Sequence, residues 1–302
     1  MKLQSYISAV VAVSLVLSLS LSFVQAEDHH AKSASFTKTR ITDSISMLQG
    51  RGGNIAVFNG EQGLVLVDNG YSYMSELLEA ELKSFGGADA IRYIINTHWH
   101  GDHTQGNLHF GHHAPIVAHE NVRRRLLTQQ EIKLFKAVSE PYPEHALPSI
   151  SYDKKLQLNI NDEDIQLIHL PGGHTDGDSI VMFTKANVIH LGDHLFNGFY
   201  PFVDVDNGGN VLTMAKNLEG LLGAINDKTI LIPGHGPLAN KADVLRFIAM
   251  LKGTNTEVQA LKDKGLNLNE IQKKGLSAQW DSWGNGFLNE NTWIGIVYSS
   301  LK

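Results

Sequence analysis

The segment N-T-H-W-H-G-D-H at residues 96–103 constrains what this chain can fold into more than any other feature. It places three histidines and one aspartate within six positions, directly after the apolar run at residues 91–95. In an extended segment the side chains at positions i and i+2 point to the same side, so His98 and His100 can face one metal ion. The sequence therefore predicts a buried strand that ends at a metal site.

The second half of this motif changes direction. Gly101 allows a sharp turn of the backbone, so Asp102 and His103 leave on a different heading, suited to a second ion. Three further ligand-type residues lie in glycine-containing loops beside apolar runs, where functional residues collect on rigid scaffolds. They are His174 in P-G-G-H-T-D-G-D, Asp193 in I-H-L-G-D-H and His235 in L-I-P-G-H-G-P.

Composition narrows the chemistry. The 302 residues carry a formal net charge of -6, which argues against nucleic-acid binding, because such proteins usually present a basic stripe. The chain has no cysteine, so histidine, carboxylate and water must do any metal chemistry. The serine-hydrolase motif G-x-S-x-G is absent as well.

The N-terminus has the features of a secretory signal peptide. Lys2 gives a positive start, residues 7–24 are rich in valine, leucine, alanine and serine, and Val24-Gln25-Ala26 suits signal peptidase. We expect residues 1–26 to be removed and the protein to be periplasmic or secreted; an uncleaved anchor is the alternative. Residues 27–44 are polar and are predicted to form a flexible segment.

Short apolar runs between glycines, asparagines and aspartates predict strands, and runs with helical spacing predict helices. Strands are expected at residues 54–58, 63–68, 91–95, 115–118, 179–183, 188–191 and 229–232, with a hairpin at 156–170. Helices are expected at residues 75–85, 120–135, 211–225 and 242–264, with a surface loop at 139–150. This order favours two packed sheets with helices outside, an α/β sandwich, in a single domain over residues 45–302.

The ligand-type residues resemble those of the metallo-β-lactamase superfamily. The H-x-H-x-D-H motif matches in full, and the later His, Asp and His follow in the expected order, over roughly residues 45–250. The resemblance implies a four-layer αβ/βα sandwich with the site along one edge, and it implies that Asp68 supports the motif loop. It assigns His98, His100 and His174 to one zinc ion, Asp102, His103 and His235 to a second, and Asp193 to a bridging position.

Two positions distinguish branches of that family. The resemblance implies zinc at His100, because relatives with a di-iron centre tend to have glutamate there and imidazole suits zinc. Asp193 stands where one group of β-lactamases has cysteine, and no lysine or arginine follows it closely. The pattern is therefore more similar to thioesterases of the glyoxalase II type and to lactonases than to true β-lactamases.

We expect a zinc-dependent hydrolase with two zinc ions per chain. A metal-bound hydroxide, oriented by Asp102, would cleave a carbonyl-type bond such as that of a β-lactam, lactone or ester. The expected partner is a small-molecule substrate, without nucleic acid and without stable membrane insertion after signal cleavage; the sequence leaves the oligomeric state open. One alternative is a mononuclear iron oxidoreductase of the sulfur-dioxygenase type, and another is a non-catalytic periplasmic metal-binding accessory protein.

Other residues near the motifs are expected to play secondary roles. Substrate selection is expected from loops at residues 105–114, 123–150 and 196–210. Trp99 is expected to pack away from the metal, and the arginines at 123–125 to lie on a solvated helix face. Candidates for the substrate mouth are Phe196, Phe199 and Tyr200. Supporting or surface roles are expected for His109, His112, His113, His119, His169, His190 and His194, of which His194 is the strongest candidate for the site.

Overall fold

The computed structural model describes residues 34–301. The predicted signal peptide and the first part of the predicted flexible segment lie outside the described residues. Within residues 34–301, no helix combines the length and the hydropathy that a membrane span requires.

A seven-stranded sheet comes from the first half of the chain, in the order β1-β2-β3-β4-β5-β6-β9. The first four strands pair antiparallel, and β4, β5, β6 and β9 pair in parallel. Its strands are β1 (Thr37–Arg40), β2 (Ile45–Gln49), β3 (Ile55–Gly60), β4 (Gly63–Val67), β5 (Ile91–Ile95), β6 (Ile116–His119) and β9 (Ile150–Tyr152).

A five-stranded sheet follows, in the order β10-β11-β12-β13-β14. Its strands are β10 (Lys155–Ile160), β11 (Glu163–His169), β12 (Ser179–Phe183), β13 (Val188–His190) and β14 (Ile230–Ile232). Neighbours pair antiparallel as far as β13, and β14 is parallel to β13. The turn of the predicted hairpin, between β10 and β11, has Asn161 and Asp162 at φ values of 53° and 56°, which these two residue types tolerate better than most.

The helices fall into two sets. Those of the first half are α2 (Ser75–Leu82), α3 (Gly101–Thr104), α4 (Asn107–Phe110) and α5 (Glu120–Leu126), and those of the second half are α6 (Val211–Leu221), α7 (Lys241–Asp263), α8 (Leu268–Lys274) and α9 (Glu290–Ser300). Short 3-10 turns are η1 (Ser72–Met74), η2 (Lys83–Phe85), η3 (Ala88–Ala90), η4 (Lys133–Phe135), η5 (Glu144–Ala146), η6 (Gly192–His194), η7 (Val205–Asn207) and η8 (Ala278–Asn285).

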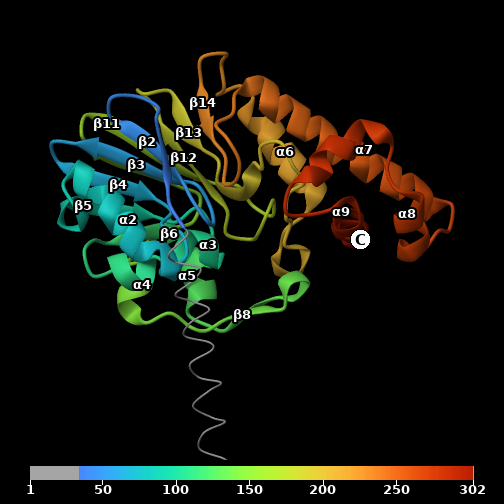
Figure 1. Cartoon of the computed structure of the whole chain (residues 1–302), viewed down its shortest axis with the longest axis horizontal. Helices are drawn as coiled ribbons and strands as arrows, with labels where there is room; N and C mark the ends of the chain where they lie inside the picture. Colours follow the sequence, from blue (N-terminus) through green and yellow to red (C-terminus); the bar gives the residue numbers. More distant parts are fainter. Residues whose placement is uncertain (1–33, 302) are drawn as a thin grey trace, which may run out of the picture.

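Alternating side chains bury both faces of the sheets, which produces four layers (Figure 1). Along β3, Ala56 and Phe58 enter the core between the sheets, while Ile55 and Val57 pack in the cluster under α2. Phe58 meets Phe183 of the second sheet with ring centroids 5.3 Å apart. The outer face of the second sheet packs against α6, α7 and α9. The predicted α/β sandwich is confirmed.

The helix predicted at residues 120–135 is wrong beyond Leu126. The chain instead forms β7 (Gln130–Ile132) and β8 (Ala137–Ser139), an antiparallel hairpin closed by η4. The chain reverses direction directly after η4, at Lys136, whose φ of 51° lies in the left-handed region. The apolar residues of this segment line a cavity rather than one face of a helix, so their helical spacing misled the prediction.

Two further differences lie near the ends of the described chain. Thr37–Arg40 form strand β1, paired with β2, although the sequence analysis placed them in a flexible segment extending to residue 44. The strand is exposed and polar, and backbone pairing at the sheet edge holds it, so hydropathy gave no signal. The C-terminal helices α8 and α9 were not predicted either; α9 buries Trp293 and Ile294 against the second sheet's helices.

Candidate metal centre

The seven predicted ligands meet at one edge of the sandwich. His98, His100, Asp102 and His103 follow β5, an interior strand of the larger sheet that carries the apolar run 91–95. His174 precedes β12, while Asp193 follows β13 and His235 follows β14, and these three strand ends lie together because β12 is antiparallel to β13 and β14 is parallel to it. The predicted convergence of the seven side chains is therefore what the structure shows.

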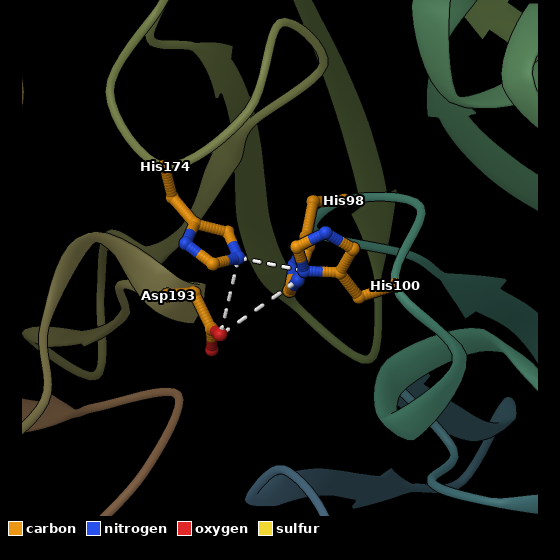
Figure 2. A group of neighbouring side chains, drawn as sticks. All are labelled: His98, His100, His174 and Asp193. Atoms are coloured by element: carbon orange, nitrogen blue, oxygen red, sulfur yellow. Dashed lines mark hydrogen bonds and ion pairs between the residues drawn. The ribbon is translucent and has the colours of Figure 1, made fainter. Parts of the chain in front are cut away.

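One group consists of His98, His100, His174 and Asp193, with one ligand atom from each residue all within 4.8 Å of one another. Figure 2 shows the three imidazoles and the carboxylate pointing toward a common centre. Nε2 of His174 lies 2.8 Å from Nδ1 of His100 and 3.3 Å from Oδ2 of Asp193. All four side chains are buried.

The second group consists of Asp102, His103 and His235. Nε2 of His235 lies 3.2 Å from Oδ2 of Asp102 and 3.4 Å from Nε2 of His103. Asp193 lies between the groups, with Oδ1 at 3.1 Å from Nε2 of His103 and Oδ2 at 3.4 Å from Nε2 of His235. Its position is the one that a bridging carboxylate would need.

In each imidazole of the first group, the ring nitrogen that faces away from the common centre has a polar partner. Nδ1 of His98 lies 3.1 Å from the Thr97 hydroxyl, and Nδ1 of His174 lies 2.8 Å from the backbone carbonyl of Phe202. Nε2 of His100 lies 3.0 Å from the Asp204 carboxylate. Such partners fix the ring tautomer and direct the other nitrogen inward. Asp204 was not among the predicted site residues, because a contact across 104 residues of sequence leaves no local pattern.

Asp68 organises the motif loop, as the resemblance implied. It accepts hydrogen bonds from the backbone N–H and the hydroxyl of Thr97, both at 2.8 Å, and Oδ2 lies 2.7 Å from Nδ1 of His103. Its backbone has a φ of 60°, an uncommon conformation that aspartate tolerates. One carboxylate therefore orients both the loop backbone and a ligand of the second group.

Two glycines allow the backbone to approach metal-ligand side chains closely. A Cβ at Gly234 would lie 1.9 Å from Oδ1 of Asp193, and one at Gly53 would lie 2.2 Å from Cε1 of His103. No side chain fits at either distance. These glycines are therefore part of the packing that fixes the site.

The two groups differ in protonation. Burial lowers the pKa of His98 well below its ordinary value and that of His174 to about 4. Burial also opposes charge on His235, but the carboxylates of Asp193 and Asp102 outweigh it and raise the pKa of His235 to about 9. His98 and His174 are therefore neutral imidazoles, whereas His235 of the second group carries a proton and a positive charge. Both conditions suit a cation-binding site, since a bound ion would take the place of that proton.

Unpartnered buried atoms provide a direct test of fit for a metal. Nε2 of His98 and Oδ1 of Asp193 are buried and make no hydrogen bond to a described residue, which costs free energy unless a further group satisfies them. Five imidazoles and two carboxylates without thiolate form a donor set that suits a divalent metal such as zinc. The residues present therefore fit divalent metal ions.

A cavity of about 480 Å³ opens above the two groups. Its lining includes side chains from all three loops that were expected to select substrate: Gln105 from the first, Gln130 to Ser139 from the second, and Phe196 and Phe202 from the third. Tyr71 and Phe287 also line it and were missed. Phe287 comes from the C-terminal region, for which the sequence offered no strand or helix signal.

The aromatic predictions had mixed outcomes. Phe196 lines the cavity, whereas Tyr200 is buried and stacks on Trp293, and Phe199 packs against Phe287 from behind. Trp99 is buried as predicted, but it also lines the cavity beside His100, with ring centroids 4.4 Å apart.

The predictions for arginine and histidine side chains near the motifs also had mixed outcomes. Arg125 is not on a solvated face, because it pairs with Asp176 at 2.8 Å and lies over the Trp99 ring. His194 is buried behind the site and lies 3.7 Å from Asp178. That carboxylate also accepts hydrogen bonds from the backbone N–H groups of His174 and Thr175. The other six histidines lie outside both ligand groups.

A family model described as the metallo-β-lactamase superfamily matches residues 48–239 of this chain. A probable metallo-hydrolase of Methanocaldococcus jannaschii is 27% identical over 184 residues, which cover 59% of this chain and 84% of that protein. A beta-lactamase-like protein 2 homolog of Caenorhabditis elegans is 24% identical over 180 residues, 59% of this chain and 53% of that protein. The match thus spans about half of the nematode protein's length.

Solved structures share the fold at low identity. A sec-alkylsulfatase from Pseudomonas sp. superposes with a TM-score of 0.63 at 16% identity, covering 89% of this chain and 50% of that chain. A metallo-β-lactamase of Cronobacter sakazakii superposes with a TM-score of 0.61 at 17% identity, covering 78% of this chain and 98% of that chain.

Proposed function

The chain belongs to the metallo-β-lactamase superfamily, and we propose that it is a dinuclear zinc hydrolase that cleaves a carbonyl-type bond. Its two groups of histidine and aspartate side chains are those of a metal-dependent hydrolase of that fold. The observation that carries this proposal is the convergence of two ligand groups around Asp193 at the floor of one cavity. A second complete group, including His235, favours two ions over the single iron of a sulfur-dioxygenase-type enzyme.

The residues divide the work in the proposed reaction. His98, His100 and His174 would hold one ion, Asp102, His103 and His235 the other, with Asp193 shared between them. Two such ions, when bound, lower the pKa of water and polarise the scissile group.

Asp102 differs from the other carboxylate. Its side chain is 19% exposed and lines the cavity, whereas that of Asp193 is 4% exposed. Asp102 can therefore accept a hydrogen bond from the attacking water and orient it toward the substrate carbonyl, while Asp193 serves the metals. Cleavage adds the water oxygen to the carbonyl carbon, and the bond to the leaving oxygen, nitrogen or sulfur breaks as that atom takes up a proton.

We further propose that the substrate is a small molecule met outside the cytoplasm. The cavity volume of about 480 Å³ is within the range typical of small-molecule sites. The N-terminal signal-peptide pattern and the net charge of -6 support an exported protein that does not act on nucleic acid.

Metal analysis combined with substrate profiling tests the proposal. The purified protein should contain about two zinc ions per chain and should hydrolyse members of a panel of esters, lactones and a chromogenic β-lactam. His98→Ala should lose both the metal and the activity. About one iron per chain with oxygen uptake would support the dioxygenase alternative, and intact metal binding without turnover of any panel member would support an accessory protein.

A further inference from the structure

We propose that the cavity selects an uncharged substrate whose apolar acyl or aryl part lies against a band of phenylalanines at the mouth. This inference rests on the proposed carbonyl hydrolysis and specifies its substrate class. The mouth is defined here as Phe135, Val138, Phe196, Phe202 and Phe287, all of which line the cavity.

The aromatic side chains form a continuous arc from one ligand group to the other. Phe196 stacks on His235 with centroids 4.9 Å apart and meets Phe287 at 6.0 Å. Phe287 meets Phe135 at 6.5 Å, and Phe135 meets Phe202 at 4.8 Å. Phe202 in turn lies 5.6 Å from His100 of the first group.

Two segments of the mouth are exposed to solvent, the hairpin with Phe135 and Val138 and the loop with Phe287. Phe287 is 54% exposed, Phe135 is 46% exposed and Val138 is 59% exposed. Single exposed apolar residues need no explanation, but exposed residues that join a ligand-lined cavity indicate a binding surface. In Figure 1 the hairpin containing β8 extends toward the C-terminal helices. The ring contact between Phe135 and Phe287 joins these two segments.

The described lining residues offer no lysine or arginine to an anionic part of the substrate, and their carboxylates are those of Asp102 and Asp193. Arg125, behind Trp99, is already paired with Asp176. A carboxylate held at the mouth, away from the metal ligands, would therefore lose water without gaining a lysine or arginine partner, which is costly in an apolar site. The neutral lining groups, including Gln105, Gln130 and Ser139, can instead bond to uncharged polar atoms.

Part of this mouth lies outside the family match. That match ends at residue 239, whereas Phe287 lies between η8 and α9. The apolar mouth is therefore completed by a segment outside the matched region.

A matched ester series tests the inference. The p-nitrophenyl esters of acetate, butyrate, hexanoate and octanoate should show kcat/KM rising about three- to fourfold per buried methylene. Adding a terminal carboxylate to the octanoyl chain should lower kcat/KM at least about tenfold, because the ion must be desolvated. Phe287→Ala and Phe135→Ala should each lower kcat/KM for the octanoate about tenfold and lower that for the acetate by a smaller factor, because the short acyl chain makes less contact with the mouth.

Binding of a neutral fluorophore, N-phenyl-1-naphthylamine, provides a readout apart from turnover. The dye should bind the wild-type protein, and Phe287→Ala should weaken that binding about tenfold. Leu245→Ala, at an exposed leucine of α7, is the matched control and should change neither measurement. Val138→Lys should raise the kcat/KM of the carboxylate-bearing ester relative to its neutral partner.

The outcomes separate this inference from the proposed function. Ester hydrolysis without chain-length dependence, or with a preference for the carboxylate-bearing ester, would overturn the inference and leave the hydrolase proposal intact. Phe287-dependent dye binding without hydrolysis of any ester would support the apolar site and contradict ester hydrolysis. If neither hydrolysis nor dye binding occurs, both ideas fail.

Discussion

At the floor of the cavity the ligand side chains are at most 19% exposed, and polar partners orient the imidazoles of the first group. At the mouth, by contrast, Phe287 and Val138 are 54% and 59% exposed. The floor relies on hydrogen bonds to fixed partners such as Asp68 and Asp204. The mouth relies on ring contacts between segments that lie far apart in the sequence. Substitutions at the floor should therefore change metal binding and turnover, whereas substitutions at the mouth should change substrate preference.

The largest effect should come from Asp193→Ala. Both oxygens of this carboxylate face imidazoles of the two groups, so its loss should lower metal content, mainly at the second group, and reduce kcat on the order of a thousandfold. That exceeds the 10- to 100-fold that loss of an outer partner typically costs. Zinc content and turnover measured on one sample provide the check. Unchanged values for both would remove Asp193 from the bridging role.

The outer partners should matter less, and each should affect its own group. Asp204→Ala frees His100 and should weaken the first site, while Asp68→Asn should weaken the second site through His103; each should cost about 10- to 100-fold in metal affinity. Asparagine is the suitable replacement at residue 68 because it tolerates the left-handed backbone there. Metal titration by calorimetry resolves the two sites. Equal weakening of both sites by either variant would contradict the division.

Chelation should distinguish the groups within the floor itself. Asp102 and His235 have side chains that are 19% exposed, whereas those of His100 and His174 are at most 4% exposed. During dialysis against a chelator, the ion of the second group should leave several-fold faster. Metal content followed over time should show two phases, and re-addition of zinc should restore activity. Loss of both ions in one phase would mean that the groups behave as a single unit.

The smallest effect is expected from Val138→Ala at the mouth. Because this side chain is largely exposed, the free energy of unfolding should change by no more than about 0.5 kcal/mol. The matched core variant Phe183→Ala removes a fully buried ring and should cost about 3–5 kcal/mol. Chemical denaturation of both variants provides the comparison. A large loss of stability in Val138→Ala would mean that the hairpin is part of the structural core.

The floor could be predicted from the sequence because its residues stand where buried strands end. The apolar runs place β5, β13 and β14, and the glycine-containing loops that follow carry ligand-type side chains. Parallel and antiparallel neighbours then bring those ends to one edge. The role of Asp68 could be proposed from the family resemblance, which implied that an aspartate at this position supports the motif loop.

The mouth and some supporting residues could not be predicted in this way. Phe135 sits in a segment whose spacing imitates a helix, and Phe287 follows a run without regular periodicity. Their proximity arises from tertiary packing between segments about 150 residues apart along the chain, which local patterns do not encode. Asp204 contacts His100, which is far away in the sequence, and no motif in its immediate sequence marks it.

The origin of the seven ligands has a consequence for the whole fold. Four come from the loop after β5 in the larger sheet, and three from loops of the smaller sheet. Bound ions would therefore connect the two sheets of the sandwich, in a chain that has no cysteine and so no disulfide to do so. By mass action, free metal at 100 times its dissociation constant adds about 2.7 kcal/mol to the resistance against unfolding. A shortage of metal would then lower the stability of the folded protein as well as abolish its activity.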